Sequence, residues 1–226
     1  MSKRGPIVTL VLVAVVAAVL LVVNMTVRTQ SAGREGAAPP SGTAVAPAPP
    51  PAVTSPAVAP ETVTYAGRTS GNEATIAIAV RAGRAAAYVC DGRSVEAWLQ
   101  GTITDGRLSV QGARGASATG TLAGDAMFGT VSMNGQQWPY SARRAAPPAG
   151  LYQGRGTVSG VPARLGWIVL PDQSQVGIGN FGGRRSPAPA LRLPVLSPVT
   201  VDGTRIEPQQ VFGDTQVVGV PGGPPS

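Results

Sequence analysis

Residues 75–90, with the sequence TIAIAVRAGRAAAYVC, decide the fold of this chain. Apolar residues recur at every second position on both sides of Ala82-Gly83, as in two antiparallel strands joined by a two-residue turn. Counting outward from that turn places Ile76 opposite Val89. One face of the hairpin is therefore apolar, and we expect further strands to cover it.

The same alternation continues through residues 62–144, where further turns allow cross-strand partners to be counted. The two-residue turns are Gly71-Asn72, Asp105-Gly106, Gly124-Asp125 and Asn134-Gly135, and a three-residue loop, Asp91-Gly92-Arg93, is predicted to place Val89 opposite Val95 and Ala87 opposite Ala97. One face stays apolar or glycine through eight short strands. This pattern predicts an all-β ectodomain, an antiparallel meander that forms a small barrel or two packed sheets.

The strand pattern restarts after a break at residues 143–150. Tyr152-Gln-Gly-Arg155 repeats the spacing of Tyr65-Ala-Gly-Arg68, and each copy precedes a Ser-Gly turn and an apolar strand. We therefore interpret residues 150–220 as a second β-rich half, partly duplicated from the first and packed on it. Residues 221–226 are predicted to be a tail.

The N-terminal part of the chain is predicted to be a membrane anchor. Residues 7–27 begin with an uncharged apolar run that is long enough to span the hydrocarbon core, and the basic residues within 1–6 would stay in the cytoplasm. A cleaved signal peptide is the alternative, but the run is long for one and no clear Ala-x-Ala site follows. Residues 28–61 contain eight prolines, which is typical of a disordered spacer.

Composition limits the chemistry of the domain. The net charge is +7, which on the outer side of a membrane would attract anionic wall polymers or lipid headgroups, whereas the dispersed arginines argue against nucleic acid. The chain has no histidine and one cysteine, Cys90, so a zinc site or a Cys-His nucleophile cannot be built. Most carboxylates lie in predicted turns. We expect no enzyme, no cofactor and no metal, and we expect Cys90 to be a small buried residue.

The candidate contact surface is predicted from two places in the sequence. By the counted register, Trp98 and Tyr88 lie on the outward face of the meander, and a face this apolar must be covered by the second half of the chain or by a partner, a glycan or a lipid. A helical turn over residues 94–100 is a further alternative that would direct Trp98 inward. The second place is a basic loop suited to an anionic surface, formed by Phe181, Arg184 and Arg185.

The order of basic start, apolar anchor, Pro/Ala-rich spacer and β-rich ectodomain resembles the uncharacterised membrane-anchored envelope proteins of actinobacteria. Tyr152-Gln-Gly-Arg155 and Gly166-Trp-Ile-Val-Leu-Pro-Asp172 are similar to segments of such proteins. The resemblance implies a placement in the cell envelope and no particular activity.

We expect a single-pass protein of the cell membrane, held by residues 7–27, with its N-terminus in the cytoplasm and its C-terminal domain outside. The expected function is a binding or scaffolding module of the cell envelope, with a cell-wall polymer or an envelope protein as partner. The alternative is a small β-barrel carrier of an apolar ligand such as a lipid.

Overall fold

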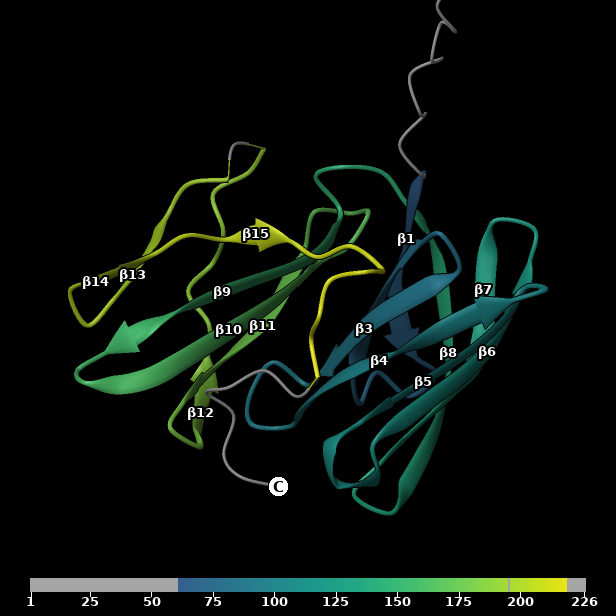
Figure 1. Ribbon diagram of the computed structural model, residues 1–226, viewed down its shortest axis with the longest axis horizontal. Coiled ribbons are helices and arrows are strands. Elements are labelled where there is room, and N and C mark those ends of the chain that lie inside the picture. The colour runs from purple at the N-terminus through teal and green to yellow at the C-terminus, as the bar shows by residue number, and fades with distance from the viewer. Residues whose placement is uncertain (1–60, 195, 219–226) are drawn as a thin grey trace, which may run out of the picture. The chain divides into compact units, whose positions relative to one another are not determined.

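The computed structural model describes residues 61–194 and 196–218 (Figure 1). The predicted anchor at residues 7–27, the predicted tail and all but the last residue of the predicted spacer lie outside this range. No helix in the described part is long and apolar enough to cross a membrane. The described residues belong to one compact unit.

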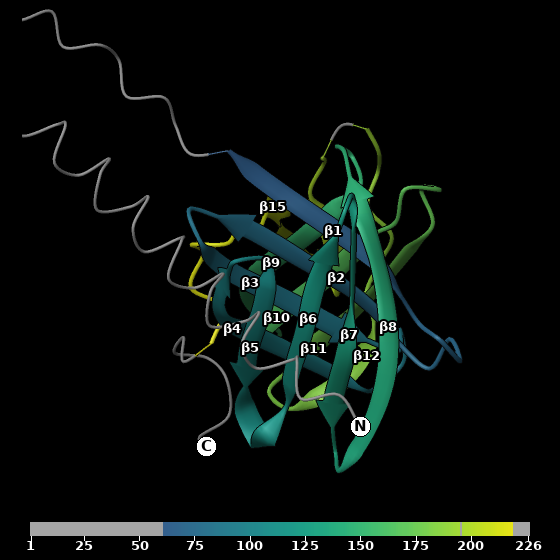
Figure 2. The same ribbon diagram turned by 90° about the vertical axis from the view of Figure 1, so that its right-hand side faces the viewer.

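Eight antiparallel strands of the first half close into a barrel (Figure 2). They are β1 (Thr62–Thr69), β2 (Thr75–Arg81), β3 (Arg84–Cys90), β4 (Glu96–Thr104), β5 (Arg107–Gly112), β6 (Ser117–Ala123), β7 (Ala126–Met133) and β8 (Gln136–Ala145), with a short 3-10 helix, η2 (Ala113–Gly115), between β5 and β6. Each strand pairs with the next, and β8 returns to β1, where Ala142 faces Gly67. The predicted all-β meander is confirmed, and of the two predicted forms it takes the barrel.

The turn residues set the register of the barrel. Three turns have positive φ at both central residues, which matches the twist of antiparallel strands: Ala82-Gly83, Asp105-Gly106 and Asn134-Gly135. The predicted partners are observed around them, with Ile76 facing Val89 and Gly129 facing Tyr140. The register predicted around the other two turns is confirmed as well.

The loop between β3 and β4 is longer than the predicted three residues, so the predicted pairing of β3 with β4 is wrong by two residues. Cys90 pairs with Glu96, so Val89 faces Ala97 and Ala87 faces Leu99. The carboxylate of Asp91 explains the longer loop, because its Oδ1 accepts hydrogen bonds from three backbone N–H groups. The donors are Arg93 at 2.8 Å, Ser94 at 2.9 Å and Val95 at 2.9 Å. Since the shift is an even number of residues, the inward and outward faces are kept. The helical turn considered over residues 94–100 is also wrong, because β4 is a strand.

Apolar side chains from all eight strands fill the inside of the barrel. Ile76, Ile78 and Leu99 have no exposed surface there, and Met127 packs among them. Trp138, at the margin of the same cluster, packs against it. The barrel therefore encloses one contiguous hydrophobic core.

The second half of the chain forms a five-stranded sheet in the order β12-β11-β10-β9-β15 and a separate hairpin, β13-β14 (Figure 1). The strands are β9 (Gly150–Val158), β10 (Val161–Val169), β11 (Gln175–Phe181), β12 (Arg184–Pro187), β13 (Val199–Val201), β14 (Thr204–Ile206) and β15 (Gln209–Gln210).

Both faces of this sheet are covered. On one face, Leu151, Ile168 and Ile178 pack against small outward side chains of β1 to β3, such as Ala77 and Ala86. On the other face, residues 188–194 and 196–206 cover a core around Trp167, whose Nε1–H donates to the carbonyl oxygen of Pro189 at 2.7 Å. The barrel and the second sheet thus share an apolar junction. The outer face of the remaining barrel strands is exposed to solvent.

Candidate functional site

The outward faces of β3 and β4 are covered by the chain itself. The ring centroids of Tyr88 and Trp98 lie 4.2 Å apart with a 32° tilt, and Tyr88 has no exposed surface. Gly166 of β10 packs on both rings, because a Cβ atom at that position would lie only 2.6 Å from Cζ of Tyr88 and 2.7 Å from Cζ2 of Trp98. Tyr88 is therefore not available to an external partner.

The carboxylate of Glu96 accepts hydrogen bonds from three side chains at this junction. Its side chain is only 6 % exposed. The hydroxyl of Tyr88 donates to its Oε2 at 2.8 Å, and Asn180 Nδ2 and Arg185 Nε donate to its Oε1 at 3.2 Å each. Burial raises the pKa of Tyr88 well above its ordinary value, so this hydroxyl remains a donor. Because both oxygens of Glu96 are already occupied, the carboxylate joins the barrel to the second sheet and is not poised as a base.

The residues of the predicted contact surface separate into two groups. Trp98, Tyr88 and Arg185 come together around Glu96. Phe181 of β11 and Arg184 of β12 face each other on the opposite side of the second sheet. There Phe181 packs against the Trp167 cluster. Arg184 is exposed.

A row of polar side chains, three of them arginines, crosses the second sheet. It consists of Arg155 on β9, Arg164 on β10, Asn180 on β11 and Arg185 on β12, each paired with the next. The guanidinium carbon of Arg164 lies 3.9 Å from the centroid of the Trp98 ring, a cation–π contact. Burial lowers the pKa of Arg164, and the charge of Arg155 lowers it further.

Neither Arg155 nor Arg164 is among the predicted contact residues, although Arg155 ends the repeated segment Tyr152-Gln-Gly-Arg155. A signal for them exists, because both arginines are equally far from the Ser159-Gly160 turn and must face each other in a two-residue hairpin. The contact of Arg164 with Trp98 has no counterpart in the local sequence.

The outer face of β5 to β8 is the exposed part of the barrel (Figure 2). Phe128 projects from β7 with 52 % of its surface exposed, between Thr121 of β6 and Ser141 of β8. Other hydroxyl and amide side chains share this outward face: Ser109, Gln111, Thr119, Thr130, Ser132 and Gln137. Strands β5 to β8 carry arginine and no carboxylate, and Arg107 and Arg143 lie on the outward face.

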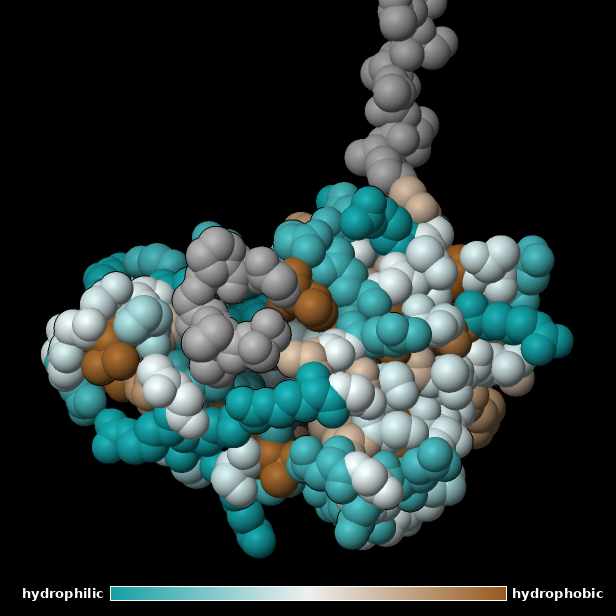
Figure 3. All heavy atoms as spheres, turned by 60° about the horizontal axis from the view of Figure 1, so that its bottom comes forward, coloured by the Kyte–Doolittle hydropathy of each residue, from teal (hydrophilic) through white to brown (hydrophobic). Residues whose placement is uncertain are grey.

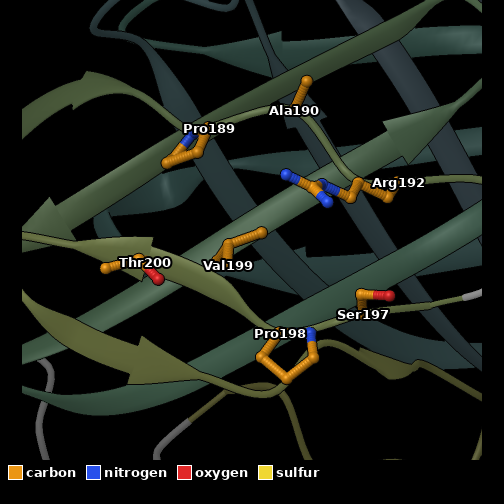
Figure 4. A pocket seen from close by; sticks show the side chains of 7 residues that line it. All are labelled: Pro189, Ala190, Arg192, Ser197, Pro198, Val199 and Thr200. Atoms are coloured by element: carbon orange, nitrogen blue, oxygen red, sulfur yellow. The ribbon is translucent and has the colours of Figure 1, made fainter.

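An open hollow of about 260 Å³ lies in the second half of the chain (Figure 4). Its lining comes from two extended segments, residues 189–192 and 197–200. Arg192 is the charged residue among the lining side chains, which also include Ser197 and Thr200. This lining offers no acid–base pair.

No group of three His, Cys, Asp or Glu residues in residues 61–194 and 196–218 could hold a metal ion. On the face drawn in Figure 3, the most hydrophobic residues form small separate patches among polar ones. A broad apolar docking area is therefore not a feature of that face.

The fold defines the class of protein: an antiparallel up-and-down β-barrel of eight strands with an accessory β-sheet packed on its side. Comparisons of the chain with protein-family models, with curated proteins and with solved structures found no match.

Proposed function

We propose that the protein is a membrane-anchored, extracytoplasmic binding module of the cell envelope, and that the outer face of β5 to β8 binds an anionic wall polymer. The observation that supports this proposal is the composition of that face. It combines hydroxyl and amide groups with an exposed aromatic ring, Phe128, and with Arg107 and Arg143 in the absence of any carboxylate on the four strands.

Each component of this face suits a charged glycan. Hydroxyl and amide side chains can donate and accept hydrogen bonds, as sugar hydroxyls do. The ring of Phe128 offers an apolar surface to the C–H side of a sugar, and the guanidinium groups pair with phosphate or carboxylate in a bidentate manner. Neighbouring strands repeat every ~4.8 Å, so the side chains are presented at regular spacing to a repeating polymer.

The alternative function, an apolar carrier, is less favoured by the packing of the barrel. A lipid inside it would have to displace Ile78, Leu99 and Met127, which have no exposed surface. The binding surface that remains is on the outside.

We infer that the second sheet is a partial duplicate of the first four strands and that it serves as a cover for the barrel. The strand orders β1-β2-β3-β4 and β9-β10-β11-β12 are both simple antiparallel meanders. The tyrosines of the two similar segments are buried in equivalent ways, with Tyr65 in the barrel core and Tyr152 in the Trp167 cluster.

The proposed function is tested by co-sedimentation of the chain with purified cell walls over a salt series. Wild-type protein should sediment with the walls, and Phe128→Ser should reduce bound protein about tenfold, because stacking on one ring is worth on the order of 1 kcal/mol or more. Val161→Ser is the matched control, since Val161 is an exposed apolar residue of the second sheet, at 39 %. Equal sedimentation of both variants and the wild type would overturn the assignment of this face.

The electrostatic part of the proposal has its own variant. Arg107→Gln with Arg143→Gln should weaken binding and reduce its dependence on salt, because two charges that attract the polymer are removed. An unchanged salt dependence would contradict an anionic partner.

For the anchor, deletion of residues 7–27 should release the chain from the membrane fraction, and retention there would refute the proposed tether.

A further inference from the structure

We propose that Arg155 and Arg164 form a binding site for a phosphate group on the second sheet. The two residues face each other directly across β9 and β10. Arg155 Nη2 and Arg164 Nη2 both donate to Oε1 of Gln153, at 3.2 Å and 3.4 Å. Two cationic groups thus converge on one neutral oxygen, a position at which an anion would be bound far more strongly than an amide.

The charge of this pair is not balanced within the described part of the chain. The ion pairs found there are Arg81–Asp214, Arg144–Glu61, Arg185–Glu96 and Arg205–Glu207. Glu96, the acidic residue at this row, is already occupied by Arg185, Asn180 and Tyr88. Like charges directly opposite each other on neighbouring strands destabilise a sheet. An anion between the two guanidinium groups would remove that cost.

The site is held in place from one side and open from the other. Arg164 stacks on Trp98, and its Nη1 donates to the carbonyl oxygen of Val217 at 2.9 Å, so it cannot turn away from Arg155. Its Nε is buried without a hydrogen-bond partner among the described residues, which shows that the local acceptors do not satisfy it. Arg155 is exposed, so an anion can reach the pair from solvent.

Phosphate is the anion that fits the charge of the pair best. Two guanidinium groups carry a charge of about +2, and a phosphate monoester carries about −1.5 to −2 at neutral pH with three acceptor oxygens. A single carboxylate would leave one positive charge unbalanced. Inorganic phosphate and a phosphate monoester share this charge, whereas the phosphodiester of a lipid headgroup carries a charge of about −1 and offers fewer free oxygens to the same two guanidinium groups.

The test is a calorimetric titration of the full chain in a neutral detergent with inorganic phosphate, at constant ionic strength set by chloride. Wild-type protein should bind phosphate saturably, and Arg155→Gln should weaken the binding at least tenfold. Arg93→Gln, which removes an exposed arginine of the β3–β4 loop, is the matched control and should bind as the wild type does. Absence of saturable binding to the wild type, or equal binding to Arg155→Gln, would overturn the proposal.

A second measurement separates binding from a structural role of Arg155. Phosphate should raise the thermal midpoint of the wild type and of Arg93→Gln but leave that of Arg155→Gln unchanged. Without phosphate, Arg155→Gln should melt at or above the wild-type temperature, because a like-charge contact is removed. A midpoint that phosphate raises equally in Arg155→Gln and in the wild type would contradict the site.

The same titration with glycerophosphoglycerol, the soluble headgroup of an anionic lipid, distinguishes the sources of phosphate. Tighter binding than that of inorganic phosphate assigns the site to a lipid headgroup, and weaker binding assigns it to free phosphate or a monoester. These residues lie on the second sheet, whereas the proposed polymer face lies on β5 to β8. Failure of either proposal therefore leaves the other intact.

Discussion

The rings of Tyr88 and Trp98 lie 4.2 Å apart on neighbouring strands of the barrel, and they pack against the backbone of Gly166 in the second sheet. This contact requires a residue without a side chain in β10. It makes the junction between barrel and sheet sensitive to a single added methyl group.

Gly166→Ala should therefore destabilise the protein by about 1–3 kcal/mol, the range for overpacking a close-packed core. The added Cβ would lie 2.6 Å from Tyr88 and 2.7 Å from Trp98. Gly156→Ala is the matched control in the same sheet, because its Cβ would meet Ile206 at an ordinary 3.4 Å. Urea unfolding measures both, and equal stability of the two variants would show that the rings do not pack on Gly166.

Glu96→Ala should cost about 2 kcal/mol, since it leaves the buried hydroxyl of Tyr88 and the side chains of Asn180 and Arg185 without their acceptor. Glu207→Ala removes an exposed carboxylate that pairs with exposed Arg205, and its cost should stay below about 0.5 kcal/mol. The two values come from the same unfolding experiment. A small cost at Glu96 would mean that the junction does not depend on this carboxylate.

Cys90 should not react with thiol reagents in the folded protein. It is buried, and burial raises the pKa of its thiol to about 12, so almost no thiolate is present at pH 8. Alkylation by iodoacetamide should be slow in buffer and fast in urea, as followed by mass spectrometry. Rapid modification in buffer would show that β3 opens without global unfolding.

Asp91 should make stability depend on pH in the acid range. Burial raises the pKa of its carboxyl, but the backbone N–H groups of the loop lower it by more, and the resulting pKa is below the ordinary value. Its stabilisation is present above the unfolded pKa of about 3.9 and is lost as the pH falls through the folded pKa. Asp91→Asn should flatten the fall in stability below pH 4 relative to the wild type, with Asp105→Asn as the turn control. An unchanged pH profile in Asp91→Asn would contradict this role.

Most of the barrel register could be predicted because its information is local. Apolar alternation fixes which side chains point inward, and Gly, Asn and Asp at the turns fix the pairing, so Ile76 and Val89 are found opposite each other. The length of the loop after Cys90 could not be predicted, because the composition Asp-Gly-Arg also suits a shorter turn. The length of that loop depends on which backbone N–H groups the Asp91 side chain accepts from.

The junction could not be predicted in the same way. Asn180 and Arg185 meet Glu96 across more than 80 residues of sequence, and no periodicity links β4 to β11 and β12. The outward position of Phe128, by contrast, follows from the inward position of its neighbour Met127. Sequence patterns thus indicated which residues face outward, and the arrangement of the two sheets decided which outward face remains exposed.

An NMR titration of labelled protein with solubilised wall polymer would show whether the outer face of β5 to β8 is the binding surface. The amide signals that shift should belong to residues of β5 to β8 near Phe128, while those of the barrel interior and of the junction near Trp98 should stay in place. Shifts confined to the junction near Trp98 would contradict the proposed surface and would favour a partner in the second sheet. Shifts spread through the barrel core would also contradict it and would favour an apolar ligand inside the barrel.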